Sequence, residues 1–214
     1  MKDDNGNIAM FATVEDLYDS LDGSYICLNK AFDDVVDFNA KAGNSLDNVT
    51  YDDLFNQTKI TLEECNELMV AAGTFTALRD GKITLEQVYE VTGKQSYDAE
   101  LEILDGLCDV LVTALQAVAQ LEALGFNVAD AFDRVMTNNN TKIFDDHQEA
   151  TQAAIKLQEQ LGEPISLQEE TYEGVKYWTM RDVNNKIRKP VDFVGVDLHE
   201  YLPSYIKEIS KTIH

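Results

Sequence analysis

Apolar residues recur at helical spacing through most of the first 140 residues, which predicts a mainly α-helical body. The expected helices span Ser24–Ala42, Ile60–Ala72, Glu100–Leu124 and a shorter stretch from Val128. Thr61 and Asn127 are the expected N-caps of the second and last of these helices, and Gly125 is a stop signal after the third. The first proline is Pro164, so nothing in this body breaks a long helix.

The pattern changes after Lys142. An amphipathic helix is predicted over His147–Leu161, with Gly162 as its end. Alternating residues over Gly174–Met180, turn residues at Asp182–Asn185 and a second alternating stretch over Lys186–Lys189 predict a β-hairpin. The expected fold is therefore mainly α, with a helical bundle followed by a small C-terminal α+β appendage.

The expected boundary between these parts lies at residue 144, giving a helical body over 1–144 and an appendage over 145–214. The stretch Gly73–Asp98 separates two predicted helices and is expected to be an insertion, with one short helix near Thr84–Val91.

The net charge of the chain limits the partners that it can bind. The 214 residues include 17 Lys and Arg against 39 Asp and Glu, a formal net charge of −22. Such a chain repels nucleic-acid backbones and anionic membranes, so binding to nucleic acid is not expected. No window is apolar and long enough to span a bilayer, and the first residues lack a signal pattern, so a cytoplasmic protein is expected.

Familiar metal-binding motifs are missing. The cysteines Cys27, Cys65 and Cys108 are far apart and form no CxxC pair, which predicts free thiols. The three histidines are also scattered, which disfavours zinc and di-iron sites. Asp80-Gly81-Lys82 is similar to the middle of a calcium loop, but the first, third and twelfth ligand places hold Thr76, Leu78 and Gln87, which carry no carboxylate.

Carboxylates are concentrated instead on two of the predicted apolar helices. They are Glu63, Glu64 and Glu67 on one helix, and Glu102, Asp105 and Asp109 on the other. Spacings of three and four place the members of each set on one helix face or on neighbouring lines of it. Among 39 acidic residues some such pairs arise by chance as solvated faces. Here the surrounding residues are apolar, and no Lys or Arg occurs between Glu100 and Leu124.

Facing carboxylates need a counter-charge. At about 5 Å two of them repel by several kcal/mol at an effective dielectric constant near ~20. Hard divalent cations with oxygen ligands satisfy this requirement, and Mg²⁺ is the usual one where the substrate is a phosphate.

The order of these motifs resembles the MazG-like superfamily of all-α nucleoside triphosphate pyrophosphohydrolases. Its relatives include the dimeric dUTPases and phosphoribosyl-ATP pyrophosphohydrolases. The resemblance rests on Glu63-Glu64-x-x-Glu67-Leu68, Asp105-Gly106-Leu107-x-Asp109, Gly125-Phe126-Asn127, Asn138-Asn139-Asn140-Thr141-Lys142 and the upstream Asp34–Asn39. The tail resembles that of phage and bacterial members. One departure is Gly106, which stands three before Asp109 where the family has a Glu.

The resemblance implies Mg²⁺-dependent or Mn²⁺-dependent cleavage of a (d)NTP to a (d)NMP and pyrophosphate, by a homodimer or a dimer of dimers. The implied metal ligands are Glu64, Glu67, Asp105 and Asp109, with Glu63 or Glu64 orienting or deprotonating the attacking water. The implied substrate contacts are Asn39, Lys59, Asn139 and Lys142.

Two other functions remain open on the sequence. A related enzyme would act on another pyrophosphate, such as phosphoribosyl-ATP or an alarmone. A non-enzymatic acidic protein would mimic nucleic acid and bind a basic partner, which the net charge of −22 suits. The basic stretch at Lys186–Lys189 either belongs to a small packing module or overhangs the active site.

Overall fold

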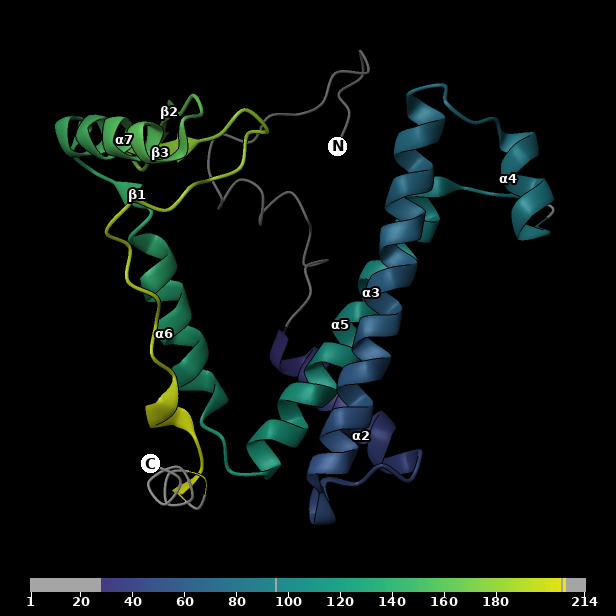
Figure 1. Ribbon diagram of the computed structural model, residues 1–214. Coiled ribbons are helices and arrows are strands. Elements are labelled where there is room, and N and C mark those ends of the chain that lie inside the picture. The colour runs from purple at the N-terminus through teal and green to yellow at the C-terminus, as the bar shows by residue number, and fades with distance from the viewer. Residues whose placement is uncertain (1–27, 95, 205, 207–214) are drawn as a thin grey trace. The chain divides into compact units, whose positions relative to one another are not determined.

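The computed structural model describes residues 28–94, 96–204 and 206, and its elements are drawn in Figure 1. The helices are α2 (Leu28–Lys41), α3 (Tyr51–Arg79), α4 (Leu85–Thr92), α5 (Ala99–Ala123), α6 (Val128–Asn140) and α7 (His147–Leu161). The strands are β1 (Ile143–Phe144), β2 (Ser166–Tyr172) and β3 (Val175–Arg181), and the short 3₁₀ helices are η1 (Leu46–Asn48) and η2 (His199–Tyr201). The protein is mainly α, as the sequence predicts.

The described residues divide into two compact units. The helical unit holds residues 28–128 with 202–206, and the sheet unit holds residues 129–201. The division falls at the start of α6, whereas the sequence places a boundary at residue 144. The strand that follows α6 pairs with β3, so the chain is already part of the sheet unit at Ile143.

α3 is much longer than the helix predicted over Ile60–Ala72. It begins after Thr50, whose side chain accepts from the Asp53 N–H while the Asp53 carboxylate accepts from the Thr50 N–H. This capping box starts the helix eleven positions earlier than the predicted cap at Thr61, so that cap is wrong. The Thr61 hydroxyl instead donates to the Gln57 carbonyl inside the helix (3.1 Å). α3 also continues through Gly73, so the intervening segment is shorter than predicted.

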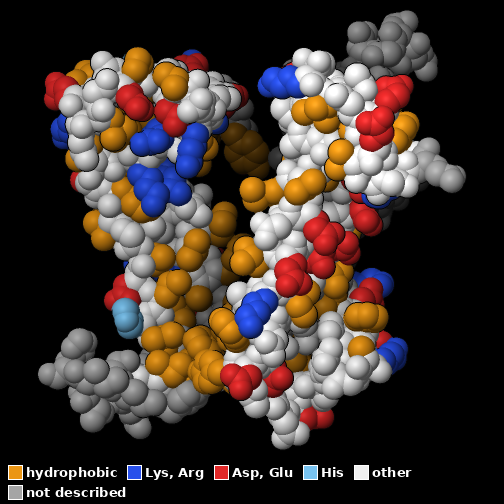
Figure 2. Space-filling model, turned by 45° about the vertical axis from the view of Figure 1, so that its right-hand side comes forward, with side chains coloured by type: hydrophobic (Ala, Val, Ile, Leu, Met, Phe, Trp, Pro, Cys, Tyr) orange, Lys and Arg blue, Asp and Glu red, His pale blue; other side chains and the backbone are white. Residues whose placement is uncertain are grey.

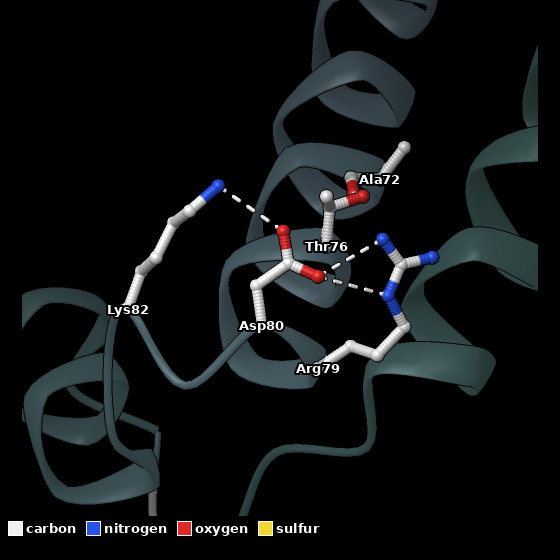
Figure 3. A network of polar contacts seen from close by, with 5 residues as sticks. All are labelled: Ala72, Thr76, Arg79, Asp80 and Lys82. Carbon is white, nitrogen blue, oxygen red and sulfur yellow. Dashed lines mark hydrogen bonds and ion pairs between the residues drawn. The ribbon is translucent and has the colours of Figure 1, made fainter.

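α3 ends in a tight charged turn, shown in Figure 3. The Asp80 carboxylate takes ion pairs from Arg79 (3.0 Å) and Lys82 (3.1 Å). The hydrogen bonds from Lys82 and Arg79 hold the pKa of Asp80 below its usual value. One arginine and one lysine therefore neutralise the Asp80 carboxylate in the turn that ends α3.

α3 and α5 pack side by side, and α2 packs on α5 (Figure 1). The two long helices run antiparallel, because Gln57 donates to the Thr113 carbonyl (3.1 Å) while Leu68 lies against Gly106. A Cβ added at Gly106 would lie 3.3 Å from both Cα and Cβ of Leu68, which is a tight contact, so a glycine favours close approach of the helices here.

The sheet unit contains a three-stranded antiparallel sheet in the order β1-β3-β2. β3 is the strand predicted from the alternation over Gly174–Met180, but its hairpin partner is β2, which precedes it. The connection is Glu173-Gly174, with φ angles of 50° and 77°, and left-handed residues of this kind suit two-residue hairpins. The predicted partner over Lys186–Lys189 is wrong, since that stretch forms one isolated bridge, Arg181 to Ile187.

α7 covers one face of this sheet (Figure 1). Its bounds and its left-handed end at Gly162 (φ 70°) are as predicted. Ala154 and Leu157 on α7 pack with the fully buried Met180 on β3, and this cluster forms the core of the unit. The opposite face of the sheet is not covered by α7.

Across the described residues, every helix falls short of the length and apolarity that a bilayer crossing requires.

Candidate metal centre

The antiparallel packing of α3 and α5 brings together the carboxylates that the sequence singled out. Between the Gln57–Thr113 and Leu68–Gly106 contacts, α3 carries Glu63, Glu64 and Glu67, and α5 carries Asp109. Spacing along each helix predicts which carboxylates share a face of that helix. The antiparallel contact shows which face of α3 lies next to which face of α5.

Glu64 lies at the centre of this group. It is half-buried, whereas Glu63, Glu67, Asp105 and Asp109 are exposed. Burial raises the pKa of the Glu64 carboxyl, and the charges of Glu67, Asp109, Glu63 and Asp105 raise it further. Five carboxylates from two helices therefore lie within electrostatic range of one another. We call these five residues the acidic group.

No residue in the described part of the chain forms an ion pair with any of the five carboxylates of the acidic group. Figure 2 shows acidic side chains gathered on the surface of the unit that contains α3 and α5, with few basic side chains among them. Negative charges without counter-ions on neighbouring helices repel one another, so a cation that binds between them stabilises their packing.

The carboxylate oxygens of the acidic group are the type of ligand that the hard divalent cations Mg²⁺ and Mn²⁺ prefer. Their side chains are not gathered around one point, because within residues 28–94 and 96–204 no three carboxylate, thiol or imidazole groups are close enough to hold an ion. A bound cation would have to draw Glu64, Glu67, Asp105 and Asp109 inward by side-chain rotation.

Lys94 is a residue near the acidic group that sequence reasoning missed. Its ammonium donates to the Glu102 carboxylate, and the nearby charges of Glu102 and Asp105 help to raise its pKa. Lys94 follows α4 and lies outside the stretch Glu100–Leu124, which has no basic residue. Only the return of the chain from α4 to α5 brings it here, and no periodicity in the sequence signals that return.

Lys94 and Glu67 line the same cavity, of about 340 Å³. Tyr97, Glu102 and Asn66 also line it. A second cavity of about 390 Å³ is lined by Asp105 and by Cys108, an exposed free thiol. Cys65 is also a free thiol, and Cys27 lies outside the described residues.

The substrate contacts that the sequence predicts have partners of their own in the structure. Asn39 is buried, and its amide nitrogen donates to the Val35 carbonyl in the same helix (3.0 Å). Lys59 is exposed and lies over the Phe55 ring, 4.3 Å from its centre. Neither of these contacts involves the acidic group.

Asn139 and Lys142 belong to the sheet unit, while the acidic group belongs to the helical unit. The Lys142 ammonium donates to the Asn139 side-chain oxygen and lies 5.6 Å from the centre of the Phe193 ring. Lys189 lies over the same ring at 4.6 Å. The two predicted residues thus contact each other, as their spacing of three at a helix end allows.

No family model matches the chain, and no curated protein or solved structure shows significant similarity to it.

Proposed function

We propose that this protein is a divalent-metal-dependent pyrophosphohydrolase that cleaves a nucleoside triphosphate to a monophosphate and pyrophosphate. The observation that carries the proposal is the acidic group, in which burial, together with four other carboxylates of α3 and α5, raises the pKa of Glu64, and whose carboxylates form no ion pair with a described residue. In the same proposal α2, α3 and α5 form a helical bundle of the MazG-like type, in agreement with the motif order described above.

Charge balance supports a metal-bound phosphate substrate. The four proposed ligands Glu64, Glu67, Asp105 and Asp109 carry a formal charge of −4, which two Mg²⁺ would cancel. A triphosphate brings a further charge of about −4, which requires additional cations. When bound, Mg²⁺ or Mn²⁺ would polarise the phosphoryl group and stabilise the charge of the transition state.

The residues of the chain would supply the remaining steps. Glu63 or Glu64 would orient the attacking water and accept its proton. Lys94 lines the cavity beside Glu67 and would donate to a phosphate oxygen of the substrate. Lys59, Asn39, Asn139 and Lys142 stay proposed substrate contacts. The sequence has no glycine-rich phosphate loop, so the cations and lysines must hold the phosphates.

Assembly as a homodimer or a dimer of dimers, in the cytoplasm, is part of the same proposal. Large apolar side chains are exposed on both helices of the acidic group, for example Met69 (70%) and Val70 (69%) on α3 and Leu101 (60%) on α5. An apolar surface of this kind is stabilised when a second copy covers it.

A panel of nucleotides tests the proposal. Purified protein is incubated with each (d)NTP, with and without Mg²⁺, and the release of pyrophosphate and monophosphate is measured. Stoichiometric release of both products with at least one nucleotide, dependent on Mg²⁺, is expected. Release of orthophosphate alone would contradict the proposed bond cleavage. No product from any nucleotide, together with capture of a basic partner, would favour the non-enzymatic acidic protein.

A further inference from the structure

The face of the sheet opposite α7 forms a cavity of about 660 Å³ in the sheet unit. Strand register places six of the lining side chains on that one face: Ile143, Gln168, Glu170, Tyr172, Tyr177 and Thr179. Asn140 and Asp145, at the two ends of the β1 segment, complete the lining. The cavity is therefore built by the regular side of the sheet and not by loops alone.

The charge of this cavity is negative. Glu170 and Asp145 line it, and none of the described residues that line it is basic. Neither carboxylate forms an ion pair within the part of the chain that the structure describes. Glu170 accepts one hydrogen bond, from the Gln168 amide (2.6 Å). The neighbouring Glu169, on the α7 side of β2, is by contrast paired with Lys176 (2.6 Å).

Arg181 is the basic residue that register places next along this face, opposite Ser166. It is not among the residues that line the cavity, and its guanidinium donates to the Asn185 carbonyl (2.8 Å) and not to either carboxylate. Two carboxylates thus remain available to an occupant that carries positive charge.

Two tyrosine rings accompany the carboxylates. Glu170 pairs with Tyr177, and Tyr172 pairs with Val175, so the two rings are diagonal neighbours on either side of the Glu170 position. Tyr172 is 51% exposed and Tyr177 is half-buried. Aromatic faces beside carboxylates attract flat organic cations through cation–π contact and charge-assisted hydrogen bonds together.

We propose that this cavity is a binding site for a small organic cation with a flat amidinium or guanidinium group on an apolar body. The volume lies within the range of small-molecule sites, about 300–1,000 Å³. The carboxylates disfavour the phosphates of a nucleotide, so this site is separate in chemistry from the proposed pyrophosphohydrolase reaction and does not depend on it.

Three ligands of one shape test the charge requirement. Benzamidine is a cation, benzamide is its neutral counterpart and benzoate is its anionic counterpart. Each is titrated into the full chain and followed by amide chemical shifts in NMR. Saturable shifts at β2 and β3 with benzamidine, about tenfold weaker binding of benzamide and no binding of benzoate are expected. Equal affinity for benzamide or benzoate, or no binding of benzamidine, would overturn the proposal.

Variants test the location. Glu170→Gln should weaken benzamidine binding about tenfold, whereas Glu159→Gln, an exposed charge on α7, should leave it unchanged. Tyr177→Leu should weaken binding, and Tyr177→Phe should keep it, because the ring and not the hydroxyl makes the contact. Circular dichroism establishes that each variant folds. Undiminished binding in folded Glu170→Gln and Tyr177→Leu would place the cation elsewhere.

A last arm separates this site from the proposed enzyme. Glu67→Gln removes a proposed metal ligand in the helical unit, and benzamidine binding should be unchanged in that variant. Loss of benzamidine binding in Glu67→Gln would overturn the assignment to the sheet unit.

Discussion

Gly106 on α5 lies directly against Leu68 on α3, where an added Cβ would come within 3.3 Å of the Leu68 backbone. The glycine allows the helices to pack closely here, because a larger side chain would press on Leu68 of the facing helix.

Gly106→Val should therefore destabilise the protein by about 1–3 kcal/mol, the usual effect of overpacking. Gly73→Ala is the matched control, since Gly73 lies inside α3 with nothing within 4 Å of an added Cβ. That control should stabilise by about 0.5–1 kcal/mol through helix propensity. Both values are measured by urea unfolding. Equal stability of Gly106→Val and the unaltered protein would show that the helices are not tightly packed at this point.

Lys94→Gln tests the residue that the structure adds to the site. If Lys94 holds a substrate phosphate in both ground state and transition state, the variant raises KM about tenfold and leaves kcat nearly unchanged. Stability should change little, because the Lys94–Glu102 pair is partly exposed (47% and 33%). Lys82→Gln, which breaks the pair with Asp80, is the control and should leave both constants unchanged. A fall in kcat with unchanged KM would instead assign Lys94 to the chemical step.

Asp182 should make the sheet unit sensitive to acid. Hydrogen bonds from the Lys186 N–H, the Asn184 N–H and the Arg188 guanidinium hold its pKa below the usual value. A lowered pKa in the folded state stabilises the fold above the unfolded value of about 3.9, and this stabilisation is lost as the pH falls through the folded value.

The difference in unfolding free energy between the unaltered protein and Asp182→Asn should therefore be largest above about pH 5 and decline below about pH 4. Trp178, the single tryptophan, lies in β3 and reports unfolding of this unit by fluorescence. Asp133→Asn, an exposed change on α6, serves as the control. A difference that grows as the pH falls would contradict the sign of the argument.

Met69→Glu tests the proposed assembly. Met69 is 70% exposed on α3, so a charge there should leave the fold of one chain intact and prevent a second copy from covering the apolar surface. Light scattering should give twice 24.0 kDa, or a higher multiple, for the unaltered protein and 24.0 kDa for the variant. Val91→Glu is the control: Val91 is 87% exposed on α4, and this variant should remain assembled. A monomeric mass for the unaltered protein at micromolar concentration would count against a dimer.

Local signals predicted part of this fold from the sequence. α7 has the predicted bounds because an amphipathic stripe is followed by Gly162, and both features act within a few residues. β2 was missed because Ser166–Tyr172 is acidic and lacks apolar alternation, while the Glu173-Gly174 turn carries the left-handed geometry without an Asn or Asp. The Asp182–Asn185 turn does form, because the Asp182 carboxylate accepts hydrogen bonds from the N–H groups of Asn184 and Lys186, but it does not lead into a second long strand.

The candidate site was also predictable only in part. Helical spacing predicts that Glu64 and Glu67 share a face, as do Asp105 and Asp109. Their electrostatic effect on Glu64 depends on the antiparallel register of α3 and α5, which shows in contacts such as Leu68 with Gly106. Lys94 comes from a separate segment, so only tertiary structure brings it to the acidic group.

The most direct test of the central claim compares pyrophosphate release by the unaltered protein and by Glu67→Gln, in Mg²⁺ and in EDTA. We predict release by the unaltered protein that requires Mg²⁺, and loss of turnover in Glu67→Gln with circular dichroism unchanged. Glu122→Gln, an exposed change on the same helix as Asp109, should keep full turnover. Full activity of Glu67→Gln, or release by the unaltered protein that persists in EDTA, would contradict the assignment of the metal centre to α3 and α5.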